Sequence, residues 1–308
     1  MGIIKRKNIF ITGGSGFIGR NLQEYLHSKY TIFAPSHVEL DLLDTKKVER
    51  FIQNNNIQII IHGANIGGGR DTIDQRDVVQ TNLTIFFNIV RNLDSLEKVI
   101  HLGSGAEYDK SRPLIDVKEG DFDKQIPQDD YGFYKYVCSK YIDKTDKIIS
   151  LRLFAVYGKY ENYLFKFISN AILKNLFHLP IIISQNVYFD YLYIEDLIKI
   201  IDYFINHTAK HNAYNISSGK RIDLLTISET INNISNFKSK IILLNKGLNH
   251  EYSADNHRLT KEITGLSFTS IEEGIRKLYD WYKSNLFKIN RNEIKQDRYI
   301  KYINVKRD

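Results

Sequence analysis

The chain has little of what a disulfide-linked or membrane-spanning protein needs. Cys138 is the only cysteine among 308 residues, which excludes an intramolecular disulfide and fits a reducing, cytoplasmic compartment. No apolar run approaches the ~20 residues that a membrane-spanning helix requires. The apolar run after the basic residues 1–7 is short and ends in glycines, so we interpret it as a first strand rather than a signal peptide. The nine histidines show no metal-ligand spacing, so no metal site is expected.

The charge balance is basic, with a formal net charge of +7. Much of this surplus lies after Phe287, in a segment that lacks a recognised nucleic-acid motif. We therefore expect a solvated basic tail over residues 291–308 and no nucleic-acid partner. The remaining surplus suits an anionic substrate such as a nucleotide diphosphate.

The strongest motif is a glycine-rich turn between an apolar strand and a helical pattern near the start of the chain. Gly13, Gly16 and Gly19 have the spacing Gly-x-x-Gly-x-x-Gly. The first glycine allows a tight turn, the second lets backbone approach a pyrophosphate, and the third lets the helix pack close to the strand. Free N–H groups of the helix N-terminus favour phosphate there. We expect a dinucleotide cofactor to contact Gly13, Ser15, Gly16, Phe17, Ile18, Gly19 and Arg20.

Strand and helix patterns alternate through the first half, which predicts an α/β fold of the Rossmann type. Its doubly wound parallel sheet would bind ligands at the carboxyl ends of the strands. The pattern is less regular after Gly158, which predicts a smaller C-terminal substrate lobe. We expect a dinucleotide-binding domain over 1–157, rejoined by 186–216, and a substrate lobe over 158–185 and 217–290.

The end of the second predicted strand carries no carboxylate, and Glu39 comes several residues late. A carboxylate at that place usually bonds the ribose 2′-hydroxyl of NAD. Its absence would remove the repulsion that a 2′-phosphate meets, and Ser36, His37 and Arg20 could bond that phosphate. We therefore expect NADPH as cofactor, with NADH possible.

Reduction of a carbonyl needs an acid for the developing alkoxide, and tyrosine can serve when a nearby lysine favours the phenolate. A lysine four residues later on a helix lies on the same face. Several pairs have this spacing, but Tyr131 and Lys135 begin a helix that follows a strand ending in Ser104. The serine hydroxyl can polarise the carbonyl. Tyr136 and Lys140, on the same helix, are the main rival pair.

On these residues the chain resembles the extended short-chain dehydrogenases/reductases, in the NAD-dependent epimerase/dehydratase family. Within it, the chain is most similar to GDP-L-fucose synthase-type 4-keto reductases, over about residues 8–285. The likeness rests on residues 12–19 (TGGSGFIG), 39–44 (ELDLLD), 61–68 (IHGANIGG), 80–82 (QTN), 102–104 (LGS) with Tyr108, 131–135 (YGFYK), 156–158 (VYG) and 215–219 (NISSG).

The resemblance implies roles for further residues. Its Tyr-Gly-x-x-Lys motif selects Tyr131 and Lys135 as catalytic, with Ser104 before Tyr108 as the catalytic hydroxyl. Lys135 would also hold the nicotinamide ribose. The expected cofactor contacts include Asp41, Leu42 and Ala64, and the expected substrate contacts are Glu107, Asn162 and Arg258. The implied activity is NADPH-dependent C4 reduction of a nucleotide-diphosphate 4-keto-6-deoxy hexose or heptose, for surface-glycan precursors, by a homodimer.

Departures from the family pattern limit the reaction. Ser104 is followed by Gly105 and Ala106, so this stretch lacks both the thiol used in C3/C5 epimerisation and the Asp-Glu pair used in dehydration. Phe189 stands where an arginine commonly reaches the substrate diphosphate, and Ala155 where an asparagine precedes Tyr-Gly. Two alternatives stay open: a nucleotide-sugar 4-epimerase with bound NAD, and a non-catalytic NADP-binding sensor that binds partners through the basic tail.

Overall fold

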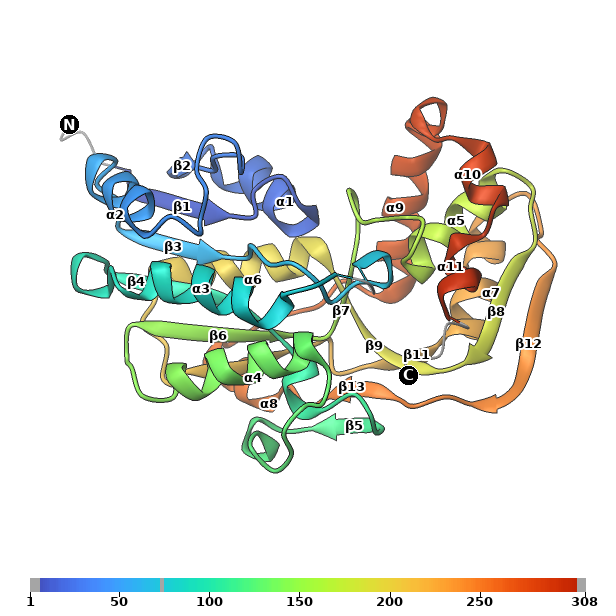
Figure 1. Cartoon of the computed structure of the whole chain (residues 1–308). Coiled ribbons are helices and arrows are strands. Elements are labelled where there is room, and N and C mark those ends of the chain that lie inside the picture. Colours follow the sequence, from blue (N-terminus) through green and yellow to red (C-terminus); the bar gives the residue numbers. More distant parts are fainter. Residues whose placement is uncertain (1–5, 73–74, 304–308) are drawn as a thin grey trace.

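Six parallel strands form the central sheet of the computed structural model, which describes residues 6–72 and 75–303 (Figure 1). Their order is β10-β6-β4-β3-β1-β2, and all neighbouring pairs are parallel. The chain therefore winds outward in both directions from β1 and β3, which confirms the predicted doubly wound fold. The strands are β1 (Asn8–Thr12), β2 (Thr31–Phe33), β3 (Ile59–His62), β4 (Lys98–Ser104), β6 (Ile148–Leu153) and β10 (Ala213–Ile216).

Helices cover both faces of this sheet. On one face lie α2 (Thr45–Asn54), α3 (Val78–Val90) and α4 (Asp130–Ile142), and on the other lie α1 (Phe17–Leu26) and α6 (Ile194–Asn206). Aspartates fix two of the starts, since Asp44 accepts a hydrogen bond from the Lys47 N–H and Asp129 from the Gly132 N–H. The Asp129 cap fixes the start of α4, which carries the predicted catalytic pair and follows β4 along the chain after the short strand 114–117.

The second part of the chain, which we call the lobe and expected to bind the substrate, contains two further sheets and several helices. One sheet has the order β11-β9-β13-β5, with β7 beside β9, and the other pairs β12 with β8. Residues 186–216 were expected to rejoin the dinucleotide-binding domain. Of the two strands wholly within this segment, β10 returns to the central sheet, whereas β9 belongs to a sheet of the lobe. The strands are β5 (Leu114–Val117), β7 (Ala155–Tyr157), β8 (Ile181–Asn186), β9 (Tyr188–Tyr193), β11 (Arg221–Asp223), β12 (Ile241–Leu248) and β13 (Tyr252–Ala254). The helices are α5 (Phe167–Leu176), α7 (Leu224–Ile234), α8 (His257–Glu262), α9 (Ile271–Ser284), α10 (Arg291–Lys295) and α11 (Arg298–Ile303).

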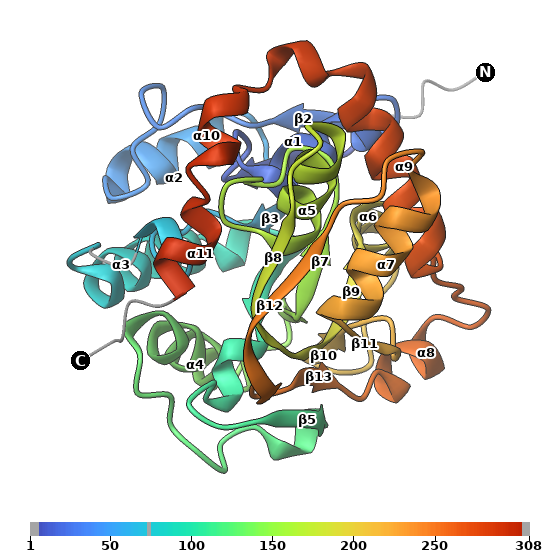
Figure 2. The same ribbon diagram turned by 90° about the vertical axis from the view of Figure 1, so that its right-hand side faces the viewer.

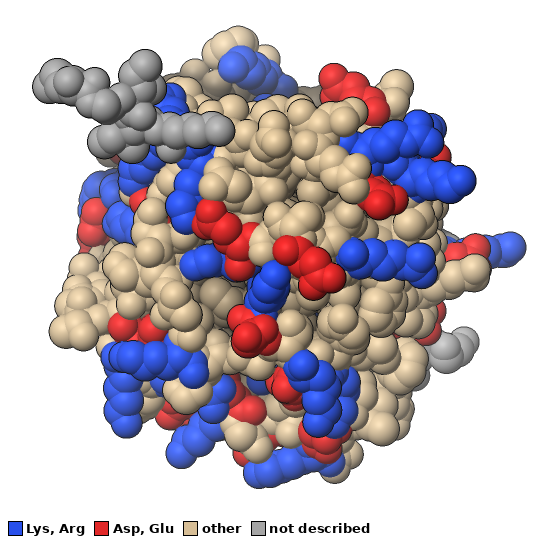
Figure 3. Space-filling view, turned by 90° about the vertical axis from the view of Figure 1, so that its left-hand side faces the viewer, with Lys and Arg blue, Asp and Glu red and all other residues tan. Residues whose placement is uncertain are grey.

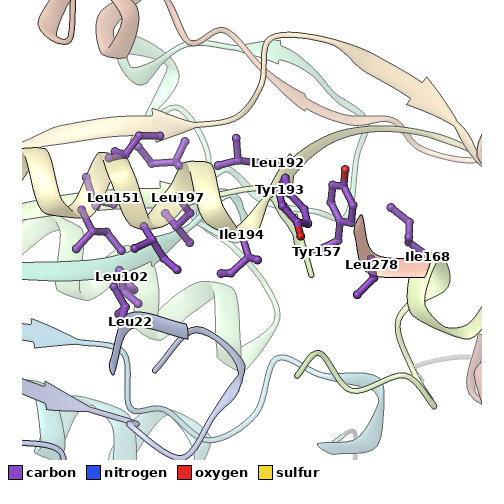
Figure 4. Close-up of a cluster of buried hydrophobic side chains, with 14 of the residues drawn as sticks. Leu22, Leu102, Leu151, Tyr157, Ile168, Leu192, Tyr193, Ile194, Leu197 and Leu278 are labelled. Carbon is purple, nitrogen blue, oxygen red and sulfur yellow. The ribbon is translucent and has the colours of Figure 1, made fainter. Parts of the chain in front are cut away.

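One hydrophobic cluster runs from the central sheet into the lobe. Leu22, Leu102 and Leu151 pack under α6, and Tyr157 and Leu278 continue the cluster on the lobe side (Figure 4). Because the two parts share this buried cluster, the lobe is held in a fixed place beside the carboxyl ends of the strands.

The C-terminal segment differs from the expected solvated tail. Residues 291–303 form α10 and α11, which pack against α5 and the lobe (Figure 2). Ile294 is 1% exposed and Tyr299 3%. The Lys174 ammonium lies 2.7 Å from the Asp297 carboxylate, in a nearly buried ion pair. The expectation of a solvated tail is therefore wrong for these residues, because their apolar side chains complete the core of the lobe. Residues 304–308 lie outside the described residues.

Basic and acidic side chains are interspersed on the face away from the lobe, at the amino ends of the strands (Figure 3). For example, the Lys7 ammonium lies 2.7 Å from the Glu97 carboxylate. That face therefore shows no extended stripe of one sign of charge. Within residues 6–72 and 75–303, no helix is long and apolar enough to cross a membrane.

The packing of α11 generates the first prediction. Tyr299→Ala should lower the free energy of unfolding by about 3–5 kcal/mol, the cost of removing a buried aromatic side chain. Phe287→Ala is the control, because Phe287 is 81% exposed, and should change it by less than about 0.5 kcal/mol. Urea unfolding measures both. Equal effects of the two substitutions would contradict the packing of α11.

Candidate active site

The turn between β1 and α1 has the geometry that a dinucleotide needs. Gly13 has φ +73°, and a Cβ there would lie 2.9 Å from the Ala64 backbone nitrogen. A Cβ on Gly19 would lie 2.3 Å from the Gly13 carbonyl oxygen, so the helix packs closely on the turn. Gly16 is the N-cap of α1, and no side chain caps this helix and no acidic residue occupies its first turn. The first-turn N–H groups are thus left to an anion, and the site fits a nicotinamide dinucleotide.

Thr12, the last residue of β1, ties the cofactor turn to the end of β3. Its hydroxyl oxygen accepts hydrogen bonds from the backbone N–H groups of Gly63 and Ala64, both at 3.1 Å. Asn82 of α3 then holds Ile66 through its backbone N–H and its carbonyl, each at 2.9 Å. The expected cofactor residue Ala64 therefore lies at the switch point of the sheet, directly beside Gly13.

Of the residues expected at the adenosine end, Ser36, His37 and Asp41 are exposed in the segment after β2, whereas Arg20 lies on α1. Arg20 is exposed, and its guanidinium carbon lies 4.1 Å from the centre of the Tyr160 ring. Asp41 accepts a hydrogen bond from the Leu43 N–H at 3.0 Å, and the Leu42 carbonyl accepts one from the Asn88 amide at 2.9 Å.

The sequence places no carboxylate at the end of β2, but the fold brings the Glu39 carboxylate back to this region. Glu39 turns back, and its carboxylate accepts a hydrogen bond from the Ser36 N–H at 2.6 Å. This backbone hydrogen bond lowers the pKa of Glu39, so the carboxylate is charged. A negative charge therefore lies beside Ser36 and His37, which weakens the sequence argument for a 2′-phosphate at this place.

The structure brings Ser104 and Tyr131 together at the carboxyl end of the sheet. Ser104 ends β4, and its hydroxyl oxygen accepts the Ala106 N–H at 3.1 Å. Tyr131 lies in the first turn of α4. Burial raises the pKa of Tyr131 to about 12, although a hydrogen bond with the Ser104 side chain acts to lower it. The Tyr131 phenol therefore lies near the Ser104 side chain, and it is protonated at neutral pH.

Lys135 is buried behind Tyr131. It is 3% exposed, and its ammonium donates a hydrogen bond to the Leu102 carbonyl of β4. Burial lowers the pKa of Lys135 to about 8. Its nitrogen lies 5.9 Å from the centre of the Tyr131 ring. The expected lowering of the Tyr131 pKa by Lys135 is not seen, because burial of the phenol raises this pKa.

The rival pair on α4 occupies a different environment. Tyr136 donates its phenolic hydrogen bond to Asp123, and the Lys140 ammonium lies 2.7 Å from the same carboxylate. Lys140 and Asp123 are both about half exposed. Because this group of three is paired within itself at the surface, the geometry favours Tyr131 and Lys135 as the catalytic pair.

A glycine-rich loop after β3 covers Tyr131. Gly68 has φ +83°, and a Cβ on it would lie 2.4 Å from the Tyr131 ring. Only glycine permits both this conformation and this approach. The same loop reaches the lobe, where Asn162 donates to the Asp71 carboxylate at 3.0 Å. The expected substrate residue Asn162 is exposed at the junction between the loop and the lobe.

Glu107 is buried and cannot contact a substrate. The side chain is 0% exposed, and its carboxylate accepts hydrogen bonds from the Ser104 N–H (2.9 Å), the Ser139 hydroxyl (2.6 Å) and the Arg152 guanidinium (2.7 Å). Both carboxylate oxygens are thus taken by protein donors. We correct the expected substrate contact: Glu107 positions Ser104 through the backbone.

Arg258 also lies away from the catalytic edge. Its guanidinium donates to the Ala213 carbonyl at 3.0 Å, at the first residue of β10. In the sheet register Ser104 is level with Ile216, at the other end of that strand. The expected contact of Arg258 with the substrate diphosphate is therefore contradicted by its placement at the amino side of the sheet.

Two features of the site were missed from the sequence. Arg152, within the apolar strand β6, is 1% exposed and pairs with Glu107; a cation in such a strand signals a buried acidic partner. Tyr252 of β13 reaches the site from the lobe, and its phenol oxygen would lie 2.5 Å from a Cβ on Gly105. The contact with Tyr252 explains why a glycine follows Ser104, but no local pattern in the sequence indicates that Tyr252 reaches the site.

Comparison with known proteins agrees with this arrangement. The profile of the NAD dependent epimerase/dehydratase family matches residues 9–217. The chain belongs to this family. The predictions of the family, of the fold class and of an oxidoreductase that uses a nicotinamide cofactor are confirmed.

Among its relatives, GDP-L-colitose synthase of Yersinia pseudotuberculosis is 24% identical over 299 residues, covering 89% of this chain and 97% of the relative. The chain is similar in structure to a GDP-mannoheptose C4 reductase of Campylobacter jejuni with NADP bound, with TM-score 0.77, 21% identity, and 92% and 100% of the two chains covered. A UDP-glucose 4-epimerase of Thermotoga maritima gives TM-score 0.79 at 17% identity, covering 91% and 99%. The fold thus accommodates both reductases and epimerases.

The buried lysine generates a pH prediction. Between about pH 8 and pH 10.5 the unfolded chain retains the Lys135 proton while the folded chain has lost it. The unfolded state then binds more protons, so stability rises with pH. Across this pH range the free energy of unfolding of the wild type should rise by up to about 3 kcal/mol relative to that of Lys135→Met. Urea unfolding measures both free energies at each pH. If they change with pH in parallel for the two proteins, the lowered pKa of Lys135 is contradicted.

Proposed function

We propose that the chain is an NADPH-dependent reductase of the C4 keto group of a nucleotide-diphosphate 4-keto-6-deoxy sugar, a hexose or a heptose. The observation that carries this proposal is the position of Tyr131, in the first turn of α4, near the Ser104 side chain that ends β4, at the sheet edge beside the glycine turn. A phenol that holds its proton at neutral pH suits the role of an acid toward a keto oxygen.

In the proposed reaction, a bound reduced nicotinamide supplies the hydride. Tyr131 donates a proton to the keto oxygen, and the Ser104 hydroxyl bonds the same oxygen so that its developing charge is stabilised. The Lys135 ammonium, held at the end of β4 by the Leu102 carbonyl, bonds the nicotinamide ribose. The loop at Gly68 lies on the Tyr131 ring and limits the access of water to it.

The substrate class rests on the named relatives and on charge. The colitose synthase and the mannoheptose C4 reductase both carry GDP-sugar names, and the net charge of +7 suits an anionic nucleotide sugar. We place the enzyme in the cytoplasm, in the synthesis of surface-glycan precursors. We further propose a homodimer, in which α4 contributes to the interface; Phe133 and Tyr141 of this helix are both 37% exposed.

A 4-epimerase with bound NAD is the second candidate. The observation that favours it is the Glu39 carboxylate beside Ser36, since a carboxylate at the end of β2 suits the 2′-hydroxyl of NAD. The likeness to the Thermotoga maritima epimerase agrees with it. An epimerase would convert its sugar without net consumption of the cofactor. A non-catalytic sensor receives less support, because it needs neither Ser104 nor Tyr131, and because α10 and α11 belong to the lobe.

The catalytic assignment is tested by removing one hydroxyl group. Tyr131→Phe should lower kcat for reduction of the preferred 4-keto sugar by ~10²–10⁴-fold, because the proton donor is lost while the ring remains under Gly68. Tyr136→Phe is the matched control on the same helix and should retain nearly full turnover. Stopped-flow oxidation of NADPH measures both. An active Tyr131→Phe with an inactive Tyr136→Phe would show that the other pair is catalytic.

A further inference from the structure

Arg70 follows the glycines that cover the catalytic tyrosine. It begins the short turn η1 (Arg70–Thr72), two residues after Gly68, whose backbone lies on the Tyr131 ring. From there its side chain extends toward the substrate lobe. The guanidinium carbon lies 4.6 Å from the centre of the Tyr299 ring of α11, and one N–H donates to the Phe165 carbonyl at 3.4 Å. A single arginine thus joins the loop over the active site to the C-terminal helix.

The charge of Arg70 has no carboxylate within 4.0 Å among residues 6–72 and 75–303. The adjacent Asp71 carboxylate accepts the Asn162 amide instead. Around the guanidinium lie an aromatic face and a carbonyl, and the side chain is half buried. A guanidinium has five N–H donors. The Phe165 carbonyl takes one of these donors and the Tyr299 side chain takes another, so three donors have no partner among residues 6–72 and 75–303.

Arg70 also acts on the lobe strand that borders the site. Its charge lowers the pKa of Tyr191 on β9, although burial raises that pKa more strongly. Phe189, two residues earlier on the same face of β9, lies 5.4 Å from Tyr191 between ring centres. β9 therefore presents aromatic rings and no cation in this region, and the nearby positive charge comes from the loop after β3.

We propose that Arg70 binds the diphosphate of the nucleotide-sugar substrate, and that Tyr299 holds the guanidinium in position for it. This inference rests on the proposed function and names a residue that would recognise the anionic part of its substrate. The planar fork of arginine suits two phosphate oxygens at once, and the contacts with Tyr299 and Phe165 leave three of its donors for them. The C-terminal helix α11 becomes part of the substrate site.

The test compares ligands with and without the diphosphate. Calorimetry with the full chain first selects the tightest ligand among GDP, dTDP, UDP, ADP and CDP. Its affinity is then compared with that of the corresponding nucleoside, measured by ligand-observed NMR, for the wild type and for Arg70→Gln. The matched control is Arg291→Gln, since Arg291 likewise donates to a carbonyl, that of Phe177, and lies over the Phe177 ring, but on α10.

Arg70→Gln should weaken the nucleoside diphosphate on the order of 10- to 100-fold, as expected for loss of charge-assisted hydrogen bonds. Its affinity for the nucleoside and for NADPH should change less than twofold. Tyr299→Leu should weaken the diphosphate by a smaller factor, because Arg70 remains but loses its support. Arg291→Gln should bind both ligands as the wild type does.

Three results would overturn the inference. If Arg70→Gln binds the diphosphate like Arg291→Gln, Arg70 does not recognise phosphate. If Arg70→Gln weakens the nucleoside and NADPH as much as the diphosphate, its role is only to hold the loop. If no nucleoside diphosphate binds the wild type, the proposed function fails together with this inference. If the wild type binds one and Arg70→Gln binds it equally well, only the inference about Arg70 fails.

Discussion

The buried ion pair between Glu107 and Arg152 holds the catalytic edge together. The two side chains are 0% and 1% exposed, and neither charge could remain there without a full set of partners. Glu107 takes donors from β4, α4 and β6. Arg152 donates onward to the Tyr108 phenol at 3.0 Å, and Tyr108 donates to Asn215 of β10 at 2.7 Å. One network thus fixes the end of β4, where Ser104 lies, relative to the helix that carries Tyr131.

The sequence predicted those parts of the site that depend on local order along the chain. The glycine spacing after β1 and the Tyr-x-x-x-Lys pair on α4 are short patterns whose geometry follows from one turn or one helix. The alternation of strands and helices likewise predicted the central sheet. The strands β5, β7, β8, β11, β12 and β13 were not predicted, because their pairing depends on segments distant in sequence.

Where sequence reasoning failed, long-range contacts decided the outcome. Arg258 has the right charge for a phosphate, but α8 packs against β10 and places Arg258 at the amino end of that strand, away from Ser104. Glu107 follows Ser104 in a Ser-x-x-Glu pattern that typically marks a helix start, and the structure shows that capping box. Its burial, however, follows from Arg152, 45 residues later. Similarly, α10 and α11 are basic in composition but are anchored by Ile294 and Tyr299.

The site therefore draws on three distant parts of the chain. The central sheet supplies the cofactor turn and Ser104, α4 supplies Tyr131 and Lys135, and the loop after β3 covers them while contacting the lobe and α11. The Glu39 carboxylate beside Ser36 favours NAD as cofactor. The protonated Tyr131 beside Ser104 suits reduction of a keto group. Cofactor consumption is thus the property that separates a reductase from an epimerase.

The most direct measurement is a substrate survey with both reduced cofactors. The purified chain is incubated with NADPH or NADH and with GDP-, dTDP-, CDP- or UDP-linked 4-keto sugars, heptoses included, and products are assigned by NMR. The account predicts stoichiometric oxidation of NADPH, slower oxidation of NADH, and a sugar reduced at C4. Epimerisation of an unmodified nucleotide sugar without net oxidation of either cofactor would contradict it and establish the 4-epimerase.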